Sequence, residues 1–373
     1  MKILVTGANG FIGRNLITTL KCRGYDDIFE YDLGVGEDVL ETACREAEFV
    51  FHLAGVNRPE RDEEFVSGNT NFTACLLGLL RAAGNASPVL FTSSIQAVRD
   101  NPYGRSKSDC EDIAFSHASQ NASEVYVYRL LNVFGKWCRP NYNSVVATFC
   151  YNVSRDLPLR IDNPDAELRL VYIDNVVEEF IAALNGAAAR DGKYCAVSTG
   201  HSIKLGELAS KLTSFQDGRK CLFVPPLYTA FDRALYATWL SYLPHDDVSY
   251  ALDLKTDERG CLAEFIKSDG SGQMFVSKTK PGITRGNHWH HTKCEKFIVI
   301  SGSGTIRLRA IDGAEIIERP VSGDAPEVVD ILPGYTHSIT NTGGTEMITL
   351  FWASEIFDTA RPDTYFLKVL EDV

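Results

Sequence analysis

The N-terminal sequence Ile-Leu-Val-Thr-Gly-Ala-Asn-Gly-Phe-Ile-Gly (residues 3–13) predicts a strand, a glycine-rich turn and a helix. The apolar start has the length of a short buried strand, and Ile12, Leu16 and Leu20 then recur at every fourth residue. In this context G-x-x-G-x-x-G is typical of dinucleotide binding, because glycines let the backbone approach a pyrophosphate and the helix N-terminus offers unpaired amides. The residues expected to hold a dinucleotide here are Gly7, Gly10, Phe11, Ile12 and Gly13.

An acidic residue ends the next predicted strand. The strand over residues 27–31 leads to Asp32, nineteen residues after Gly13. A carboxylate at this place can accept hydrogen bonds from the adenine ribose hydroxyls and repel a 2′-phosphate. The alternative is a polar residue that only terminates the strand. We therefore add Asp32 to the cofactor-binding residues and leave NADH and NADPH both open.

Strand-like and helix-like segments continue to alternate along the first half of the chain. Apolar runs at 49–55 and 89–94 have the length of buried strands, and a helical pattern at 71–83 separates them. Another strand-like run follows at 125–128. This alternation predicts an α/β fold with a doubly wound parallel sheet.

A tyrosine and a lysine four residues apart are the strongest candidates for catalytic residues in this half of the chain. Pro102 suits the first position of a helix and Asn101 its N-cap, which puts Tyr103 and Lys107 on one helical face. A lysine ammonium beside a phenol favours the phenolate, so the tyrosine could exchange a proton with a carbonyl nearer neutral pH. Alone, this spacing is more often an ordinary solvated helix face. The dinucleotide fold around it favours catalysis.

The composition is that of an ordinary globular protein. The 373 residues are 45% hydrophobic and 23% charged, which is enough chain for two or three domains. The net charge of -12 argues against a nucleic-acid or anionic membrane surface, so we expect small-molecule partners. Apolar runs fall short of the ~20 residues that span a bilayer, and we expect a cytoplasmic protein. Ten cysteines without C-x-x-C spacing predict buried thiols.

The order of these motifs resembles the extended short-chain dehydrogenase/reductases that act on nucleotide sugars. The resemblance rests on the glycine loop, on segments 52–55 and 92–94, and on the tyrosine-lysine pair. It implies that Tyr103 protonates the reduced oxygen, that Lys107 binds the nicotinamide ribose, and that Ser94 orients the carbonyl. The remaining residues that it implicates are Ser93, as the alternative serine, and Leu53, Ala54 and Gly55, beside the cofactor.

From about residue 244 the pattern changes to short β-branched runs between turn signals. Turn dipeptides recur mostly nine to twelve residues apart, a spacing typical of an all-β barrel or sandwich. We therefore expect two domains. Residues 1–245 form the nucleotide-binding core with a small substrate-binding region, and residues 246–373 form the β domain.

Three histidines and a glutamate in the β domain predict a divalent metal site. His288 and His290 alternate as side chains on one face of a strand do, and Glu295 and His337 complete the set. Such ligands can fill a first shell and leave one position open. An isolated H-x-H is more often a chance surface pattern, but the β context favours the metal. Zinc is the expected ion, with other divalent metals possible.

The β domain resembles the cupin barrels. Residues 282–302 match the first cupin motif, and residues 333–341 match the second with one residue fewer between proline and histidine. Over nearly its whole length the chain resembles the CapF-type enzymes of capsular polysaccharide synthesis. The segments that carry this wider resemblance are 53–59, 135–142 and 286–293.

The wider resemblance implies a bifunctional homodimeric enzyme. A zinc cupin would epimerise C3 of a UDP-linked 4-keto-6-deoxy-N-acetylhexosamine, and the reductase domain would reduce the C4 ketone with NADPH or NADH. The product would be UDP-N-acetyl-6-deoxy-talosamine, on the N-acetyl-L-fucosamine pathway. The chemistry is consistent, because a Lewis acid on the ketone acidifies the C3 proton. Lys296, Tyr335 and His291 stay open as the base.

Three other functions stay possible on the sequence alone. The cupin could be a noncatalytic sensor or dimerisation module on a single-function reductase or epimerase. The nucleotide fold could be a redox-sensing module that has lost catalysis, although Tyr103 and Lys107 argue against this. A dehydratase is a weaker alternative, because Ile95 and Gln96 follow Ser94 where such enzymes carry acidic residues.

Overall fold

The computed structural model describes residues 1–370, which form two compact units. The N-terminal unit contains Met1–Thr213 and Tyr228–Pro244, and the C-terminal unit contains Ser214–Leu227 and the chain from His245 on. None of the described helices is both long and apolar enough to cross a membrane.

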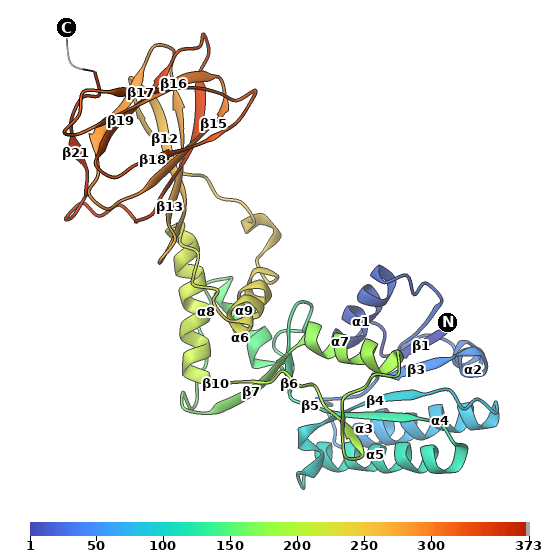
Figure 1. Ribbon diagram of the computed structural model, residues 1–373. Helices are drawn as coiled ribbons and strands as arrows, with labels where there is room; N and C mark the ends of the chain where they lie inside the picture. Colours follow the sequence, from blue (N-terminus) through green and yellow to red (C-terminus); the bar gives the residue numbers. More distant parts are fainter. Residues whose placement is uncertain (371–373) are drawn as a thin grey trace. The chain divides into compact units, whose positions relative to one another are not determined.

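A seven-stranded sheet lies at the centre of the N-terminal unit, in the order β2-β1-β3-β4-β5-β9-β8 (Figure 1). Every neighbouring pair is parallel except the pair of β8 and β9. The predicted parallel, doubly wound sheet is therefore confirmed. The strands are β1 (Ile3–Thr6), β2 (Ile28–Tyr31), β3 (Phe49–His52), β4 (Val89–Ser94), β5 (Val125–Leu130), β8 (Arg190–Asp191) and β9 (Tyr194–Cys195).

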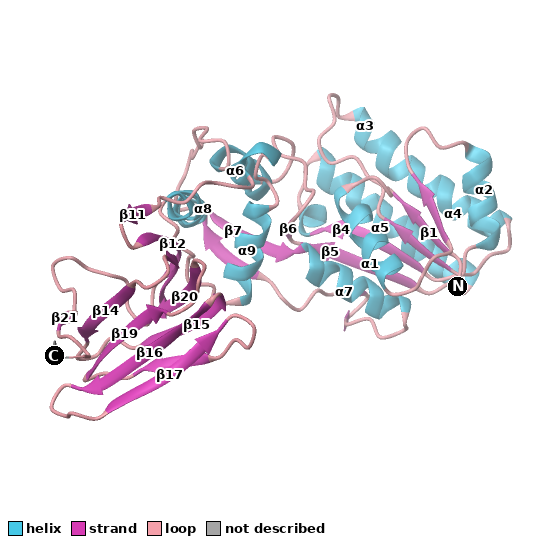
Figure 2. Ribbon diagram, turned by 90° about the horizontal axis from the view of Figure 1, so that it is seen from above, coloured by secondary structure: helices cyan, strands magenta, loops and turns pink. Residues whose placement is uncertain are grey.

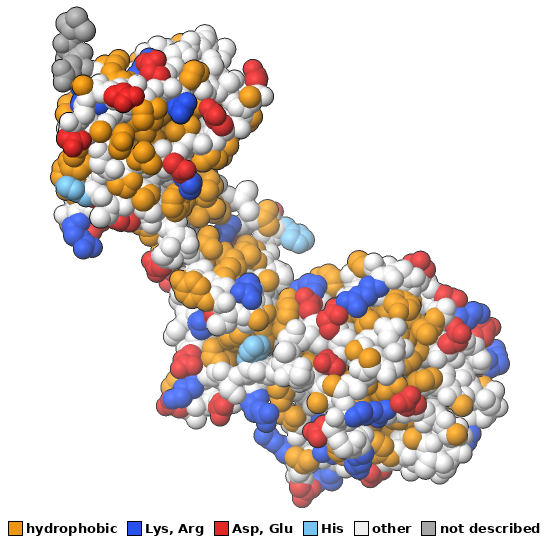
Figure 3. Space-filling view, viewed as in Figure 1, with side chains coloured by type: hydrophobic (Ala, Val, Ile, Leu, Met, Phe, Trp, Pro, Cys, Tyr) orange, Lys and Arg blue, Asp and Glu red, His pale blue; other side chains and the backbone are white. Residues whose placement is uncertain are grey.

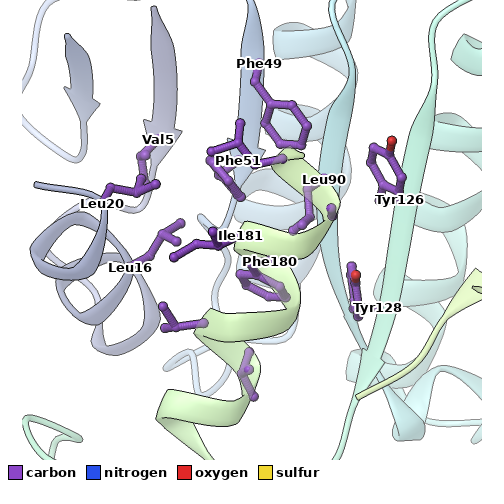
Figure 4. Close-up of a cluster of buried hydrophobic side chains, with 14 of the residues drawn as sticks. Val5, Leu16, Leu20, Phe49, Phe51, Leu90, Tyr126, Tyr128, Phe180 and Ile181 are labelled. Atoms are coloured by element: carbon purple, nitrogen blue, oxygen red, sulfur yellow. The ribbon is translucent and has the colours of Figure 1, made fainter. Parts of the chain in front are cut away.

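Helices cover both faces of this sheet because successive strand residues point in opposite directions. Ile3 and Val5 face a core that the helices α1 and α7 close, whereas Leu4 faces the core under α2, α4 and α5. Figure 4 shows the first core, in which Leu16 of α1 and Phe180 of α7 lie among side chains from the strands. The helices are α1 (Phe11–Cys22), α2 (Glu37–Glu46), α4 (Phe72–Ala82), α5 (Pro102–Asn121) and α7 (Ile173–Leu184).

A smaller region completes the N-terminal unit. Its three-stranded sheet has the order β10-β7-β6, and helical patterning after Gly200 corresponds to α8, in which Leu208 and Leu212 are fully buried. The elements are β6 (Asn132–Phe134), α6 (Val145–Val153), β7 (Glu167–Tyr172), β10 (His201–Lys204), α8 (Leu205–Lys220) and α9 (Ala230–Leu240). Short helical segments also occur, namely α3 (Glu63–Phe65), η1 (Val66–Asn71) and η2 (Ile95–Val98) in the N-terminal unit and η3 (His245–Asp247) in the C-terminal unit.

The chain from β11 on consists of strands and loops (Figure 2). Two antiparallel sheets, β11-β12-β13-β20-β15-β18 and β17-β16-β19-β14-β21, share one apolar core that includes Phe297, Ile306 and Met347. The predicted all-β region is confirmed. The strands are β11 (Lys255–Asp257), β12 (Gly260–Ser268), β13 (Gly272–Thr279), β14 (Thr284–Trp289), β15 (Glu295–Ser301), β16 (Ser303–Ala310), β17 (Ile316–Ser322), β18 (Val328–Ile331), β19 (Tyr335–Asn341), β20 (Met347–Ala353) and β21 (Tyr365–Phe366).

The surface and the cysteines follow the composition only in part. Lys and Arg side chains lie among Asp and Glu side chains on the face seen in Figure 3. All ten cysteines are free, as expected. Five are buried and four are exposed, so the prediction of buried thiols holds for half of them.

Candidate functional site

The glycine loop is shaped by close backbone approaches. Gly7 has a φ of +71°, and a Cβ there would lie 2.7 Å from the amide nitrogen of Ala54. A Cβ on Gly13 would lie 2.2 Å from the carbonyl oxygen of Gly7. Helix α1 begins at Phe11, and no described side chain caps its N-terminus. Its first amides are therefore available to an anion such as a pyrophosphate.

Asp32 lies against this loop. One carboxylate oxygen accepts a hydrogen bond from the amide of Asn9 at 2.6 Å, and the other accepts from the amide of Leu33 at 2.8 Å. The predicted acidic residue at the end of β2 is thus joined directly to the glycine turn. Asp32 thus lies beside the glycine turn, where a carboxylate that binds the adenine ribose is expected.

The start of α5 places the tyrosine and the lysine as the sequence predicts. The Asn101 side chain accepts a hydrogen bond from the amide of Gly104 at 2.7 Å, and Pro102 is the first helical residue, so the predicted cap is confirmed. The Tyr103 hydroxyl donates to Asn57 Oδ1 at 3.0 Å. Lys107, which is 5% exposed, donates from Nζ to the backbone carbonyl of the threonine two residues before Ser94, at 3.1 Å.

Burial shifts the proton affinities of both residues. Burial raises the pKa of Tyr103, and a hydrogen bond with Ser94 opposes the rise only in part. Burial lowers the pKa of Lys107, with the charges of Cys110 and Glu111 opposing it. Burial of the phenol therefore acts against the phenolate, and the expectation that the lysine ammonium favours it stays a prediction.

The two neighbouring serines have different surroundings. Ser94 caps η2, where its hydroxyl accepts a hydrogen bond from the amide of Gln96 at 3.1 Å and keeps its own proton to donate. Ser93 is buried, and its hydroxyl donates to Glu111 Oε1 at 2.5 Å. The structure thus brings Ser94 to Tyr103, whereas Ser93 belongs to a buried network in which Glu111 also pairs with Arg129 at 2.5 Å.

Segment 53–55 connects the glycine loop to the lysine. Ala54 meets Gly7, and a Cβ on Gly55 would lie 3.2 Å from Lys107 Nζ and 3.1 Å from Asn69 Oδ1. Asn69 is buried within η1, a π-helical segment, and its side chain hydrogen-bonds both backbone groups of the residue after Gly55. Such π-bulges occur often at functional sites.

A cavity of about 550 Å³ lies in the N-terminal unit. Arg58, which follows the Asn57 partner of Tyr103, lines it and donates a hydrogen bond to the carbonyl of Tyr142. Tyr142 and Arg160 also line the cavity, together with several amide side chains. Two guanidinium groups and neutral donors are typical of a phosphate-binding pocket.

The C-terminal unit brings the four predicted metal ligands together. Donor atoms of His288, His290, Glu295 and His337 all lie within 4.8 Å of one another. The residues come from β14, from the turn after it, from the first residue of β15 and from β19. The alternation of His288 and His290 predicts that both lie on one strand. His290 instead lies just beyond the end of β14.

A β-bulge aims His288 at this cluster. The register of β14 against β19 shifts between Gly286 and His288, so that His288 pairs with His337. Gly286 and Asn287 have φ values of +96° and +59°, and a Cβ on Gly286 would lie 2.7 Å from the His337 carbonyl oxygen. Bulges of this kind redirect side chains next to active sites.

The donor set fits a divalent cation. His290 Nε2 and His337 Nε2 each lie 3.2 Å from Glu295 Oε2, yet none of these buried atoms completes a well-aligned hydrogen bond with any residue in 1–370. Burial lowers the pKa of His288 to about 4, which keeps its imidazole neutral. Burial alone would raise the pKa of Glu295, but the two imidazoles outweigh it and hold that pKa well below its usual range. A neutral imidazole at His288 and a carboxylate at Glu295 are protonation states that bind zinc.

Comparison with known proteins shows the family. Residues 3–196 match the NAD dependent epimerase/dehydratase family, and residues 255–365 match the polysaccharide biosynthesis C-terminal domain. The chain therefore belongs to the NAD dependent epimerase/dehydratase family. More particularly, it is a CapF-type homologue over its full length, and the resemblance seen in its sequence is confirmed.

Three relatives define this similarity. The capsular polysaccharide assembling protein CapF from Staphylococcus aureus has 46% identity and a TM-score of 0.93, with 99% of this chain and 100% of that chain covered. A structure of CapF with the inhibitor 3-isopropenyl-tropolone has 42% identity and a TM-score of 0.88, with the same coverage. A Pseudomonas aeruginosa protein named UDP-2-acetamido-2,6-beta-L-arabino-hexul-4-ose reductase is 44% identical over 371 residues, which is 100% of both chains.

Sequence reasoning missed several residues of these sites. Asn57, Arg58 and Tyr142 surround the tyrosine or line the cavity, and Asn69 supports the lysine loop. In the sequence, segments 53–59 and 135–142 carry the family resemblance, and only residues 53–55 of them are also assigned to a site. Those same segments supply Asn57, Arg58 and Tyr142, so the resemblance was the signal that could have located them.

Proposed function

We propose that the protein is a bifunctional UDP-sugar enzyme of capsular polysaccharide biosynthesis. Its C-terminal unit, as a cupin barrel, epimerises C3 of a UDP-linked 4-keto-6-deoxy-N-acetylhexosamine, and its N-terminal unit then reduces the C4 ketone to give UDP-N-acetyl-6-deoxy-talosamine. The observation that carries the proposal is that one chain holds both a Ser94–Tyr103–Lys107 cluster beside a dinucleotide loop and four convergent metal-ligand atoms. The full-length similarity to a protein named as a UDP-sugar reductase supports the substrate class.

In the reductase site, each residue acts on the ketone or its surroundings. The glycine loop and Asp32 hold NADPH or NADH, which supplies the hydride for C4. Burial raises the pKa of Tyr103, so its hydroxyl would hold a proton and would give that proton to the ketone oxygen. Ser94 donates a hydrogen bond to the same oxygen and orients it. Lys107 lies next to Gly55, where it can hold the nicotinamide ribose.

The sugar nucleotide would occupy the cavity that Arg58 lines. Arg58 and Arg160 supply positive charge for the diphosphate, and the amide side chains supply hydrogen bonds for the uridine or sugar. We expect the reacting ketone at the end of this cavity nearest Arg58, because Arg58 directly follows Asn57, whose Oδ1 accepts a hydrogen bond from the Tyr103 hydroxyl.

In the cupin site, His288, His290, Glu295 and His337 would hold the divalent ion. A bound zinc ion supplies Lewis-acid polarisation of the ketone, which makes the neighbouring C3 proton acidic. Tyr335 is the residue best placed among the sequence candidates to move that proton, because it lies two residues before His337 on the same strand face. Lys296 pairs with Asp330, and His291 is exposed and packs against Trp289.

The division of labour assigns residues 1–245 to the reductase domain and residues 246–373 to the cupin domain. Nucleotide sugars and reduced nicotinamide nucleotides are made in the cytoplasm, so the enzyme would act there, as a homodimer. Among its homologues a CapF structure contains a tropolone inhibitor. A tropolone presents two adjacent oxygens, which suits chelation of a bound metal.

Solvent exchange separates the two activities. In D2O without a nicotinamide cofactor, the C3 proton of the substrate should exchange, since enolisation needs the ketone and the metal but no hydride. Tyr103→Phe should keep this exchange and lose reduction. His337→Ala should lose exchange and still reduce a ketone that already has the product's C3 configuration. His245→Ala changes an exposed histidine outside both proposed sites, so it serves as the control and should retain both activities.

The NMR signal of the C3 proton is the measurement. Exchange that persists in His337→Ala, or that disappears in Tyr103→Phe, would place the epimerising chemistry in the N-terminal unit. Reduction without any metal-dependent exchange would reduce the C-terminal unit to a noncatalytic sensor or dimerisation module.

A further inference from the structure

We propose that Asp363 is a positioning residue for the metal centre, and that residues 362–369, which we call the C-terminal strap, hold all three histidines in their ligating arrangement. This inference rests on the proposed metal site. It adds residues that lie outside both cupin motifs, and it explains how the ligand atoms come to face one another.

The backbone carbonyl of Asp363 selects the tautomer of His290. His290 Nδ1 lies 2.5 Å from this carbonyl oxygen. A carbonyl oxygen can only accept, so Nδ1 must carry the proton of the imidazole. The lone pair is thereby left on Nε2, the nitrogen that lies 3.2 Å from Glu295 Oε2 inside the cluster. Ligating histidines typically donate their second ring nitrogen in this way.

The carboxylate of Asp363 fixes the turn between two ligands. Its oxygens accept hydrogen bonds from the amides of His291 at 2.9 Å, Thr292 at 3.0 Å and Lys293 at 2.9 Å. This turn joins His290 to Glu295, so three successive amides held by one carboxylate set the spacing of those two ligands. Asp363 has a φ of +36°, a left-handed conformation that Asp and Asn adopt more readily than other side chains.

The rest of the strap reaches the other two histidines. Leu367 donates its amide to the carbonyl of Asn287 at 3.0 Å, and the residue two further on donates to the Asn287 side chain at 3.2 Å. Asn287 directly precedes His288 and occupies the β-bulge. Thr336, which directly precedes His337, donates its hydroxyl to the Leu367 carbonyl. One neighbour of each histidine is therefore bonded to the strap.

A buried lysine closes the connection. Lys293 is 7% exposed, and its Nζ donates to Thr364 Oγ1 at 2.9 Å and to the Pro362 carbonyl at 3.3 Å. β21 also pairs with β14, with Phe366 opposite His288. These contacts join the strap to the backbone segments that carry the metal ligands. The strap therefore holds the ligands in position, in addition to covering the edge of the sheet.

Three variants test this role. Asp363→Ala removes the acceptors of three amides and places a less tolerant side chain at a left-handed position. Asp363→Asn keeps one acceptor oxygen and suits that conformation. Asp358→Ala removes a carboxylate from the same part of the chain whose recorded partners are the amide of Ala360 and the side chain of Arg361. It is the matched control.

The measurements are zinc affinity, by competition with a chelator, and the absorption spectrum of the cobalt-substituted protein. Loss of a supporting contact around a metal site typically weakens metal binding about 10–100-fold. We expect a loss of that size and an altered cobalt spectrum in Asp363→Ala, a smaller loss in Asp363→Asn, and wild-type behaviour in Asp358→Ala. Wild-type affinity and an unchanged spectrum in Asp363→Ala would overturn the proposal.

A second measurement needs no variant and no metal. In the metal-free wild-type protein, 15N NMR of His290 should show a proton on Nδ1, and an Nδ1 without a proton would overturn the inference even if Asp363→Ala did not fold. The two proposals fail separately. Wild-type protein that binds no zinc contradicts the metal function, whereas zinc binding that is indifferent to Asp363→Ala contradicts only the role of the strap.

Discussion

Asp32 has two effects on the cofactor site, and alanine at this position removes both. Its carboxylate accepts the amide of Asn9 in the glycine turn, and the same negative charge opposes a 2′-phosphate. We expect NADH to be used detectably by the wild-type enzyme. In Asp32→Ala the preference for NADPH over NADH should rise about tenfold, which corresponds to ~1.4 kcal/mol.

The ratio of KM values for the two cofactors measures this effect. Asp26→Ala, an exposed carboxylate just before the same strand, is the control and should leave the ratio unchanged. Strict NADPH dependence that Asp32→Ala does not alter would show that the carboxylate takes no part in cofactor choice.

His52 should make the stability of the N-terminal unit depend on pH. It is 1% exposed, its ring nitrogens lie 2.8 and 2.9 Å from the hydroxyls of Thr6 and Thr73, and burial lowers its pKa to about 3, with the charge of Lys107 adding to this. The unfolded chain, with a histidine pKa near ~6.5, takes up the proton first. The contribution of neutral His52 to the free energy of unfolding is complete above the pKa of the unfolded chain. It is lost as pH falls toward 3, at ~1.4 kcal/mol per pH unit.

Urea unfolding of the wild type and of His52→Asn measures this linkage. The variant should be less stable at pH 7.5, and the difference should narrow by roughly 2 kcal/mol by pH 5, because only the wild type loses this contribution. Aromatic contacts with Phe72 and Phe91 are common to both pH values and cancel. A difference that is independent of pH would contradict the assignment.

Gly13, near the start of α1, has no room for a side chain. Comparison of an alanine variant at this position with one at Gly78 tests this. A Cβ on Gly13 would lie 2.2 Å from the Gly7 carbonyl, whereas a Cβ on Gly78 in α4 meets nothing within 4 Å. Gly78→Ala should therefore stabilise the protein by about 0.4–1 kcal/mol. Gly13→Ala should weaken cofactor binding and lower the melting temperature. Equal behaviour of the two variants, by calorimetry and cofactor titration, would show that the close approach is unimportant.

Local chemistry explains which elements the sequence predicted well. The start of α5 was predictable because Asn101, Pro102 and the amide of Gly104 that Asn101 caps are close together in the sequence. The parallel sheet was predictable because strand-like and helix-like runs alternate along the chain. The choice of Ser94 over Ser93 was not settled in advance, because it depends on Glu111 reaching back from α5.

Long-range features escaped prediction for a physical reason. The bulge at Gly286 and Asn287 changes which side chains face inward. The alternation of residue types along a strand does not predict such a shift in register. His290 finds its hydrogen-bond partner 73 residues away, in Asp363. The sequence near His290 and near Asp363 contains no pattern that predicts this hydrogen bond.

Two independent cores allow the proposed activities to be damaged separately. The sheet of the N-terminal unit is closed by helices on both faces, and the sheets of the C-terminal unit close on one another. Both proposed sites act on the same carbonyl of the same substrate, so the product of one site is the reactant of the other. Whether the intermediate leaves the enzyme between the two steps then becomes an experimental question.

Mixing two defective variants answers it. Tyr103→Phe should make the C3-epimerised ketone and fail to reduce it, whereas His337→Ala should reduce that ketone and fail to make it. Neither variant alone should form product from the starting UDP-4-keto sugar and NADPH. Together they should restore product formation, at a rate that rises with the concentration of each, because a released intermediate must diffuse between molecules. Product is followed by NMR and by nicotinamide absorbance. If each variant keeps its own half-reaction and the mixture still forms no product, the intermediate is not released and the two-step scheme must run within one molecule.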